Sequence, residues 1–335
     1  MIEKHYNGVI EQVVSGIGNV EHNSILVRYS NDFSIWDLES VNHYKEQPDI
    51  FFTCHEFSYN RVAEAYEPYL ALIRQMFHKY GSGTLEEFME ECDVYKLQRP
   101  VFESYFETGF CQRTEQILID EVEYEQERMN NSIVTMIRKL SEICPIVIVL
   151  NRFQLASKST MQLTNQLLHT KNKNIGIVLG VNDVQSIPEF VHEEWDAICE
   201  SMDDRNMVFH IGNANKKKES DVLVYYSDYE SEEGYRKLNN LVYFLDFDQA
   251  DHHLSKIERR IKFDNFTISK KKYYQLLLLQ IMVSILQRDI AKALESCEDL
   301  EKLQDQEKEG SFYYNFWVAT SYMYLGKLEE AMVFA

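Results

Sequence analysis

The 335-residue chain is poor in proline and glycine, with 5 and 12 copies, which leaves little room for disordered linkers. It also lacks a long apolar run. The longest stretch, LLLLQIMVSIL at 276–286, is too short to span a bilayer and contains Gln280 and Ser284. The N-terminal MIEKHYNGVIEQ has no apolar signal core. These absences predict a cytoplasmic protein without membrane association, and the length favours two domains.

Positive charge is in short supply, since the formal net charge is −20 and the pI is near 4.9. This balance argues against direct nucleic-acid binding by the segment. The cysteines form no C-x-x-C pair, so we expect reduced, mostly buried thiols and no metal. Adjacent His252 and His253 point about 100° apart on a helix and do not predict a ligand pair. No Ser/His/Asp or Cys/His nucleophile set can be identified from spacing.

Strand-like runs alternate with helical patterns in the first half of the chain. Strands are expected near 25–29, 50–54, 146–150 and 175–181. Helical patterns are found at 5–17, 37–47, 68–79, 130–143 and 159–170, with Ser157 or Ser159 as the N-cap of the last. Such alternation predicts a parallel α/β sheet covered by helices on both faces, with all four strands in one sheet.

The turn after the first strand is where a phosphate-binding sheet carries G-x-x-x-x-G-K-[ST]. The equivalent segment here is SNDFSIWD, 30–37. Ser30 and Ile35 take the glycine positions, Trp36 the lysine position and Asp37 the hydroxyl position. The branched side chain blocks the approach of backbone amides to phosphate, the indole supplies no charge, and the carboxylate repels phosphate. The segment therefore predicts that phosphate binding has been lost.

The stretch 146–160 resembles the second nucleotide motif of STAND-class AAA-like signalling ATPases, which include bacterial transcription activators of the maltose-activator type. In that family an apolar strand ends in two acids, followed by an apolar residue, His, Trp, Ala, Asp, a variable residue and Ser. Here the apolar run 146–150 is followed by Asn151 and Arg152, then by Phe153, Gln154, Leu155, Ala156 and Ser157. AYEPYLALIRQMF, 65–77, resembles the family's helix after its second strand.

The resemblance implies a P-loop NTPase-like fold whose acids hold Mg²⁺ and activate water. Because Asn151 supplies no charge and Arg152 reverses it, we expect a pseudo-ATPase without catalysis, metal or cofactor. The vestigial nucleotide site would comprise Ser30, Ile35, Trp36, Asp37, Asn151 and Arg152. We further expect Asp37 to bond to Asn151 or Arg152, and Trp36 to fill the nucleotide space. An active ATP-binding STAND ATPase and an unrelated α/β domain are the alternatives.

The second half, from about residue 235, changes to helical patterns with a shared plan. Ala250, Ala293 and Ala331 lie 43 and 38 residues apart, and each follows an apolar residue by three positions. The last copy, 317–335, resembles tetratricopeptide repeats in its spacing of small, aromatic, glycine and apolar residues. We expect these alanines in close helix–helix contacts, and a protein or peptide as the partner of the repeats.

The sequence thus predicts a degenerate AAA/STAND-like α/β domain at 1–204, a connecting region at 205–234 and tetratricopeptide-like repeats at 235–335. The chain stops inside the second helix of the last repeat, so we expect a longer natural protein with an output domain. The expected function is a non-catalytic regulatory or signal-transduction module within a larger bacterial regulator. A pure protein-interaction adaptor is a further alternative.

Overall fold

The computed structural model describes residues 2–18, 23–30, 34–58, 63–111, 122–170, 172–183, 187–205, 207–211, 232–263, 268–303 and 311–334. The chain divides into two compact units. The first, called the sheet unit, comprises Met1–Gly109 and Glu127–Tyr225. The second, called the helical unit, comprises Phe110–Gln126 and Tyr226–Ala335.

The sheet unit is built on five parallel strands in the order β2-β3-β4-β1-β5. The strands are β1 Asn23–Tyr29, β2 Phe51–Glu56, β3 Ile146–Asn151, β4 Ile175–Asn182 and β5 Val208–Ile211. The prediction of four parallel strands in one sheet is confirmed, and β3 lies inside the sheet, as its unbroken apolar sequence requires. β5 lies within 205–234, which the sequence pattern left as a connection, and pairs with β1.

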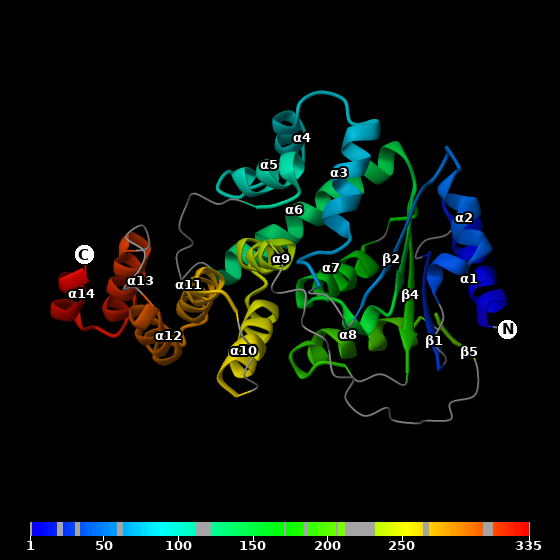
Figure 1. Ribbon diagram of the computed structural model, residues 1–335. Coiled ribbons are helices and arrows are strands. Elements are labelled where there is room, and N and C mark those ends of the chain that lie inside the picture. The colour runs from blue at the N-terminus through cyan, green and yellow to red at the C-terminus, as the bar shows by residue number, and fades with distance from the viewer. Residues whose placement is uncertain are drawn as a thin grey trace. The chain divides into compact units, whose positions relative to one another are not determined.

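Helices cover both faces of this sheet (Figure 1). On one face lie α1 Ile2–Gly16 and α2 Glu39–Lys45, and on the other α7 Lys158–His169 and α8 His192–Asp203. Of the two expected caps for α7, Ser157 is the one used, because its hydroxyl accepts the Thr160 N–H at 3.2 Å. The α/β class predicted from the alternating pattern is therefore confirmed.

The helices expected at 68–79 and 130–143 are present as α3 Tyr69–Tyr80 and α6 Val122–Ile143. Between them lie two helices that the sequence pattern did not predict, α4 Leu85–Glu91 and α5 Arg99–Thr108. α4 begins with a capping box, in which Thr84 Oγ1 accepts the Glu87 N–H at 3.2 Å and the Glu87 carboxylate accepts the Thr84 N–H at 2.7 Å. α5 ends at Gly109, whose φ of 79° favours glycine.

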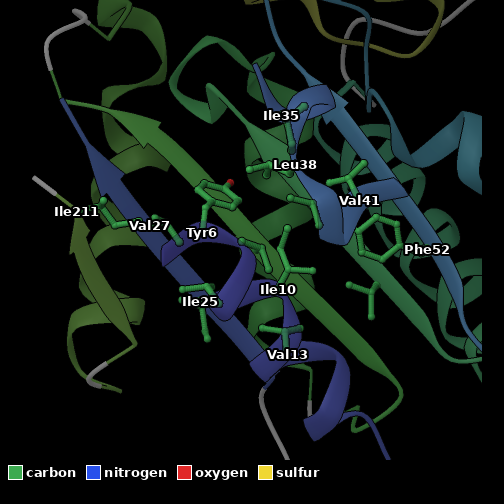
Figure 2. Packing of buried hydrophobic residues seen from close by; sticks show 14 of the residues in the cluster. Tyr6, Ile10, Val13, Ile25, Val27, Ile35, Leu38, Val41, Phe52 and Ile211 are labelled. Atoms are coloured by element: carbon green, nitrogen blue, oxygen red, sulfur yellow. The ribbon is translucent and has the colours of Figure 1, made fainter. Parts of the chain in front are cut away.

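One side of the sheet packs against α1 through a continuous apolar core (Figure 2). The buried side chains of α1 follow the helical period predicted for it, and Figure 2 shows Tyr6, Ile10 and Val13 among the core residues between α1 and the sheet. Burying each such side chain contributes about 1.5–3 kcal/mol. Gly176 of β4 allows this close approach, since an added Cβ would lie 2.6 Å from Val13.

The helical unit consists of consecutive helix pairs. Its helices are α9 Glu232–Tyr243, α10 Phe247–Phe263, α11 Lys270–Leu286, α12 Ile290–Leu303, α13 Ser311–Tyr324 and α14 Leu328–Phe334. α9–α10, α11–α12 and α13–α14 are each joined by a three-residue connection and pack against each other as hairpins. Each second helix also contacts the first helix of the next hairpin.

The three connections share one backbone geometry. Leu245, Arg288 and Gly326 all adopt left-handed φ values of 66°, 64° and 72°. In each turn the following N–H donates to the carbonyl five residues earlier, at 2.8, 2.8 and 2.9 Å, as in a Schellman motif. The spacing between these residues, 43 and 38, equals that of the alanines.

The repeated alanines occupy equivalent buried positions. Ala250 and Ala293 are fully buried, and Ala331 is 4% exposed. The N–H of each alanine donates to the carbonyl of the last turn residue, at 3.0, 3.1 and 3.0 Å. Their burial is as predicted, because a small side chain is required where paired helices approach.

Candidate functional site at the carboxyl ends of the strands

The topology of the sheet indicates where a ligand of this fold would bind. The chain leaves β1 toward α2 on one face, whereas it leaves β3 and β4 toward α7 and α8 on the other. In open α/β sheets, ligands bind outside the carboxyl ends of the strands where the connections diverge in this way. The candidate site is therefore the set of side chains at the ends of β1 to β4.

A buried polar group lies at this end of the sheet, on the α1 side. Tyr29 ends β1 and donates its hydroxyl to Asn151 Oδ1 at 2.7 Å, with both side chains at most 1% exposed. Tyr6 of α1 packs edge-on against Tyr29, with ring centroids 6.5 Å apart. A Cβ added to Gly180 of β4 would collide with Tyr6 Oη and lie 2.6 Å from Asn151 Oδ1. Only glycine leaves room for this group.

Burial sets the ionisation of Tyr6. It raises the pKa of Tyr6 well above the ordinary value, and the nearby Tyr29, Glu56 and Cys54 raise it further. The phenol therefore stays protonated at neutral pH. It can exchange hydrogen bonds but cannot serve as a base.

A second polar group surrounds Glu56, the last residue of β2. Its Oε2 accepts the Ile35 N–H at 3.0 Å and the Ser34 hydroxyl at 3.5 Å, while its Oε1 lies 3.4 Å from Arg152 Nη1. The Glu56 and Arg152 side chains are 13% and 21% exposed. We call Ser34, Ile35, Glu56 and Arg152 the Glu56 cluster. Its single carboxylate is thus held by a charged donor and by two donors from the turn before α2.

The two polar groups are neighbours across the sheet. The parallel register pairs Glu56 directly with Asn151. Because side chains alternate along a strand, both point to the face that carries Phe52 and Val149. Asn151 is fully buried, and its Nδ2 has no hydrogen-bond partner among the described residues. The residue with the unused donor is thus paired across the strands with the residue that carries the carboxylate.

The sequence-predicted residues are only partly brought together. Ser30 follows β1, and the Ile35 side chain is fully buried in the apolar core that contains the buried face of α1. Asn151 ends β3, and Arg152 follows it with a left-handed φ of 54°. The backbone of Ile35 and the side chain of Arg152 meet at Glu56, a residue absent from the predicted set.

The expectations for Trp36 and Asp37 were wrong. Because Ile35 enters the core, the next residue of the short turn points outward, and Trp36 is 48% exposed with Lys45 Nζ 4.3 Å from its ring centroid. Asp37 is also exposed, and among the described residues no hydrogen bond or ion pair joins it to Asn151 or Arg152. Water satisfies an exposed carboxylate, so it needs no such partner.

Sequence reasoning missed Tyr6, Tyr29 and Glu56. One usable signal existed for two of them. Tyr29 is the last residue of the strand expected at 25–29, Glu56 lies two residues beyond the strand expected at 50–54, and parallel strands end at one edge of a sheet. Tyr6 carried no such signal. The helical pattern of α1 identified an apolar face, and an aromatic residue on that face is usually core.

On the opposite side of β1, Arg28 binds the end of β4 and α8. Its Nη1 donates to Asp183 Oδ1 at 3.2 Å, its Nη2 donates to Cys199 Sγ at 3.3 Å, and its guanidinium lies 5.9 Å from the Trp195 ring centroid. Burial raises the pKa of Cys199, although Arg28 lowers it in part. The thiol is therefore not activated as a nucleophile.

The other residues weighed for chemistry have ordinary surroundings. His252 and His253 have ring centroids 5.6 Å apart. Burial lowers the pKa of His252 to about 4 and lowers the pKa of His253 well below its ordinary value. Across the described ranges, no three His, Cys, Asp or Glu side chains are grouped so as to hold a metal. None of the six cysteines forms a disulfide among the described residues, and Cys92, Cys111, Cys144 and Cys297 are buried. The acidic stretch EQILIDEVEYEQER, 115–128, whose sequence predicts a solvated helix, lies outside the described residues as far as residue 121. NKKKESD, 215–221, whose sequence predicts a surface loop, lies wholly outside them.

Comparisons with known proteins give no assignment for the chain. No protein-family model matches it, and no curated protein matches it. Within the described part of the chain, no helix is both long and apolar enough to cross a membrane. The interpretation of the site therefore rests on its own geometry.

Proposed function

We propose that the protein is a non-catalytic regulatory module of the degenerate STAND type, in which the sheet unit is a platform and the helical unit binds a protein. One observation carries this proposal. At the carboxyl ends of the strands, charged groups are paired with one another, Glu56 with Arg152 and Arg28 with Asp183. A catalytic phosphoryl-transfer site instead keeps its cations free for phosphate and its acids free for Mg²⁺.

The residues of the 30–37 turn support the same proposal. A phosphate loop wraps phosphate with backbone N–H groups, but here the N–H of Ile35 is bonded to Glu56. The lysine position holds Trp36, which is half exposed and lies beneath Lys45. At the end of β3, Asn151 and Arg152 carry no negative charge with which to hold Mg²⁺.

Calorimetric titration with ATP and Mg²⁺ tests the platform half of the proposal. We expect no saturable heat for the wild-type protein at micromolar to millimolar nucleotide. Saturable micromolar binding that is lost when Arg152 is changed to Gln would instead favour the alternative of a working ATP-binding site.

The three equivalent hairpins of the helical unit favour a protein as its partner, because we interpret them as tetratricopeptide-like repeats. The last hairpin exposes apolar side chains at its tip and along α14. These side chains, which we call the α14 patch, are Met323, Tyr324, Leu325, Leu328, Met332 and Val333, each at least 41% exposed. The acidic Glu329 and Glu330 are exposed on the same helix. This combination fits a helix with an apolar face and basic flanking residues.

A pair of synthetic helical peptides tests this partner chemistry. Both carry the same leucine face, and the flanking residues are lysine in one peptide and glutamate in the other. We expect the lysine peptide to bind more tightly, and Met332→Asp to weaken its binding about tenfold or more. Phe263→Asp is the matched control, because Phe263 is 75% exposed in the helical unit but lies outside the α14 patch. Equal binding of the two peptides, or equal loss in both variants, would contradict a site at α14.

A further inference from the structure

The donors of the Glu56 cluster are those of an anion-binding site, and the anion that they bind is the carboxylate of Glu56 itself. A guanidinium, a backbone N–H and a hydroxyl converge on one carboxylate. The donors come from the turn before α2 and from the residue after β3, and the carboxylate comes from β2. Three separate segments thus supply one anion and its donors.

Two independent observations indicate that this place suits an external ligand. It lies at the carboxyl ends of the strands, near the point where connections diverge to opposite faces. The buried Asn151 Nδ2, on the strand position paired with Glu56, also has no hydrogen-bond partner among the described residues. A carboxylate has two oxygens, whereas a tetrahedral oxyanion presents more acceptors and could use this additional donor.

We propose that Ser34, Ile35 and Arg152, with Asn151 Nδ2, form a latent site for a phosphate-sized oxyanion, and that the Glu56 carboxylate keeps it closed. Glu56 is 13% exposed and Arg152 21%, so a small anion can reach the cluster from solvent. It binds only when Glu56 leaves, because two anions at one set of donors repel each other. The inference rests on the proposed function, in which the wild-type platform takes no nucleotide.

Titration with inorganic phosphate tests the proposal directly. We expect the Glu56→Ala protein to bind phosphate at least about tenfold more tightly than wild type, as measured by thermal shift at constant ionic strength. Adding Arg152→Gln should abolish this gain, because the charged donor is lost. Formate should also raise the melting temperature of Glu56→Ala, since it restores the missing carboxylate.

Glu67→Ala is the matched control. Glu67 is another half-buried carboxylate of the same unit, 3.4 Å from His55 Nε2, and its side chain is 14% exposed. Its removal should produce no phosphate or formate response. If Glu56→Ala does not fold, Glu56→Gln keeps the side-chain shape and is expected to show a smaller gain in phosphate affinity.

The outcomes separate this inference from the proposed function. If neither Glu56 variant binds phosphate more tightly than wild type, the donors do not form an anion site and the inference is overturned. If wild type itself binds phosphate as tightly as Glu56→Ala, the carboxylate does not close the site. Binding of ATP and Mg²⁺ by wild type would overturn the proposed function, whatever the phosphate titration shows.

Discussion

The two units differ in the sequence separation of the contacts that define their structure. In the sheet unit, the contacts that define the candidate site join distant segments, as in the hydrogen bond from Tyr29 to Asn151 across 122 positions. In the helical unit, each hairpin is set by a turn of a few residues that occurs three times with one geometry. Local sequence therefore determines each hairpin of the second unit, whereas the site in the first unit depends on strand register. This difference can be tested with substitutions that disrupt either a contact between distant segments or a local turn.

The largest effect on stability is expected at Gly180, which lies against Tyr6 and Asn151, two residues distant from it in the sequence. Gly180→Ala would force a Cβ against Tyr6 Oη and Asn151 Oδ1 in a fully packed core, so it should destabilise the protein by about 3 kcal/mol. Urea denaturation measures the loss. Gly8→Ala is the control, since nothing lies within 4 Å of the added Cβ and a helical alanine should stabilise by about 0.5–1 kcal/mol.

A second variant shows whether Tyr6 is the cause. Tyr6→Phe removes the hydroxyl that the new Cβ would meet, so Gly180→Ala combined with Tyr6→Phe should lose less than the sum of the two single changes. Strict additivity would mean that Gly180 and Tyr6 are not in contact. It would contradict the close approach of Gly180 to Tyr6 that the structure shows at the end of β1.

In the helical unit, the corresponding test is overpacking at a repeated small position. Ala293→Leu should cost about 2 kcal/mol, because Ala293 is fully buried where α12 meets its neighbours. Ala291→Leu, exposed on the same helix, should change stability by less than about 0.5 kcal/mol. Equal melting temperatures for both variants would contradict the equivalence of the hairpins.

The difference between local and distant contacts also explains what the sequence could predict. Four strands of the sheet were predicted from strand-like runs that alternate with helical patterns, and the spacing of Ala250, Ala293 and Ala331 matched the spacing of the turns. The short β5 was not predicted, because only Ile211 of its four residues is buried and His210 interrupts the apolar pattern. α4 was missed because a helix of seven residues carries little periodicity. α5 was missed although its buried residues Val101, Phe102, Tyr105 and Phe106 follow a helical period.

The site was harder to predict than the fold. Motif spacing located Arg152, but the carboxylate expected to bond to it or to Asn151 was Asp37, whereas Arg152 pairs with Glu56. The choice between these two acids depends on which side chain of the 34–37 turn enters the core. That choice is made by packing of Ile35 against distant residues, which no local pattern records.

A smaller effect is expected from pH, in the helical unit. His253 is buried and its Nε2 lies 2.8 Å from Gln249 Nε2, so the folded state holds it neutral. A histidine with a lowered folded pKa contributes stability above pH 6.5 that is lost as the pH falls. At pH 5.5 the loss is about 1.4 kcal/mol for one fully buried histidine with an unfolded pKa near 6.5.

Thermal melts of wild type and His253→Asn between pH 7.5 and 5.5 measure this loss. The variant should lose less stability than wild type, while the burial that lowers the pKa of His252 leaves it some pH dependence. His192→Asn, which removes an exposed histidine of the sheet unit, should follow wild type. Parallel curves for all three proteins would show that His253 is not held neutral by the fold.

The smallest effect concerns the left-handed turn residue, where the three hairpins differ in sequence but not in geometry. Arg288 is exposed with a φ of 64°, whereas Gly326 takes the same position in the last hairpin with a φ of 72°. A left-handed residue other than glycine costs about 1 kcal/mol, so Arg288→Gly should stabilise by about 0.5 kcal/mol after the greater freedom of the unfolded chain is subtracted. Gly326→Ala should destabilise by about 1 kcal/mol. If the urea midpoint rises for Arg288→Gly and falls for Gly326→Ala, the two hairpins share one turn geometry. Shifts of the same sign in both variants would mean that the hairpins are not equivalent.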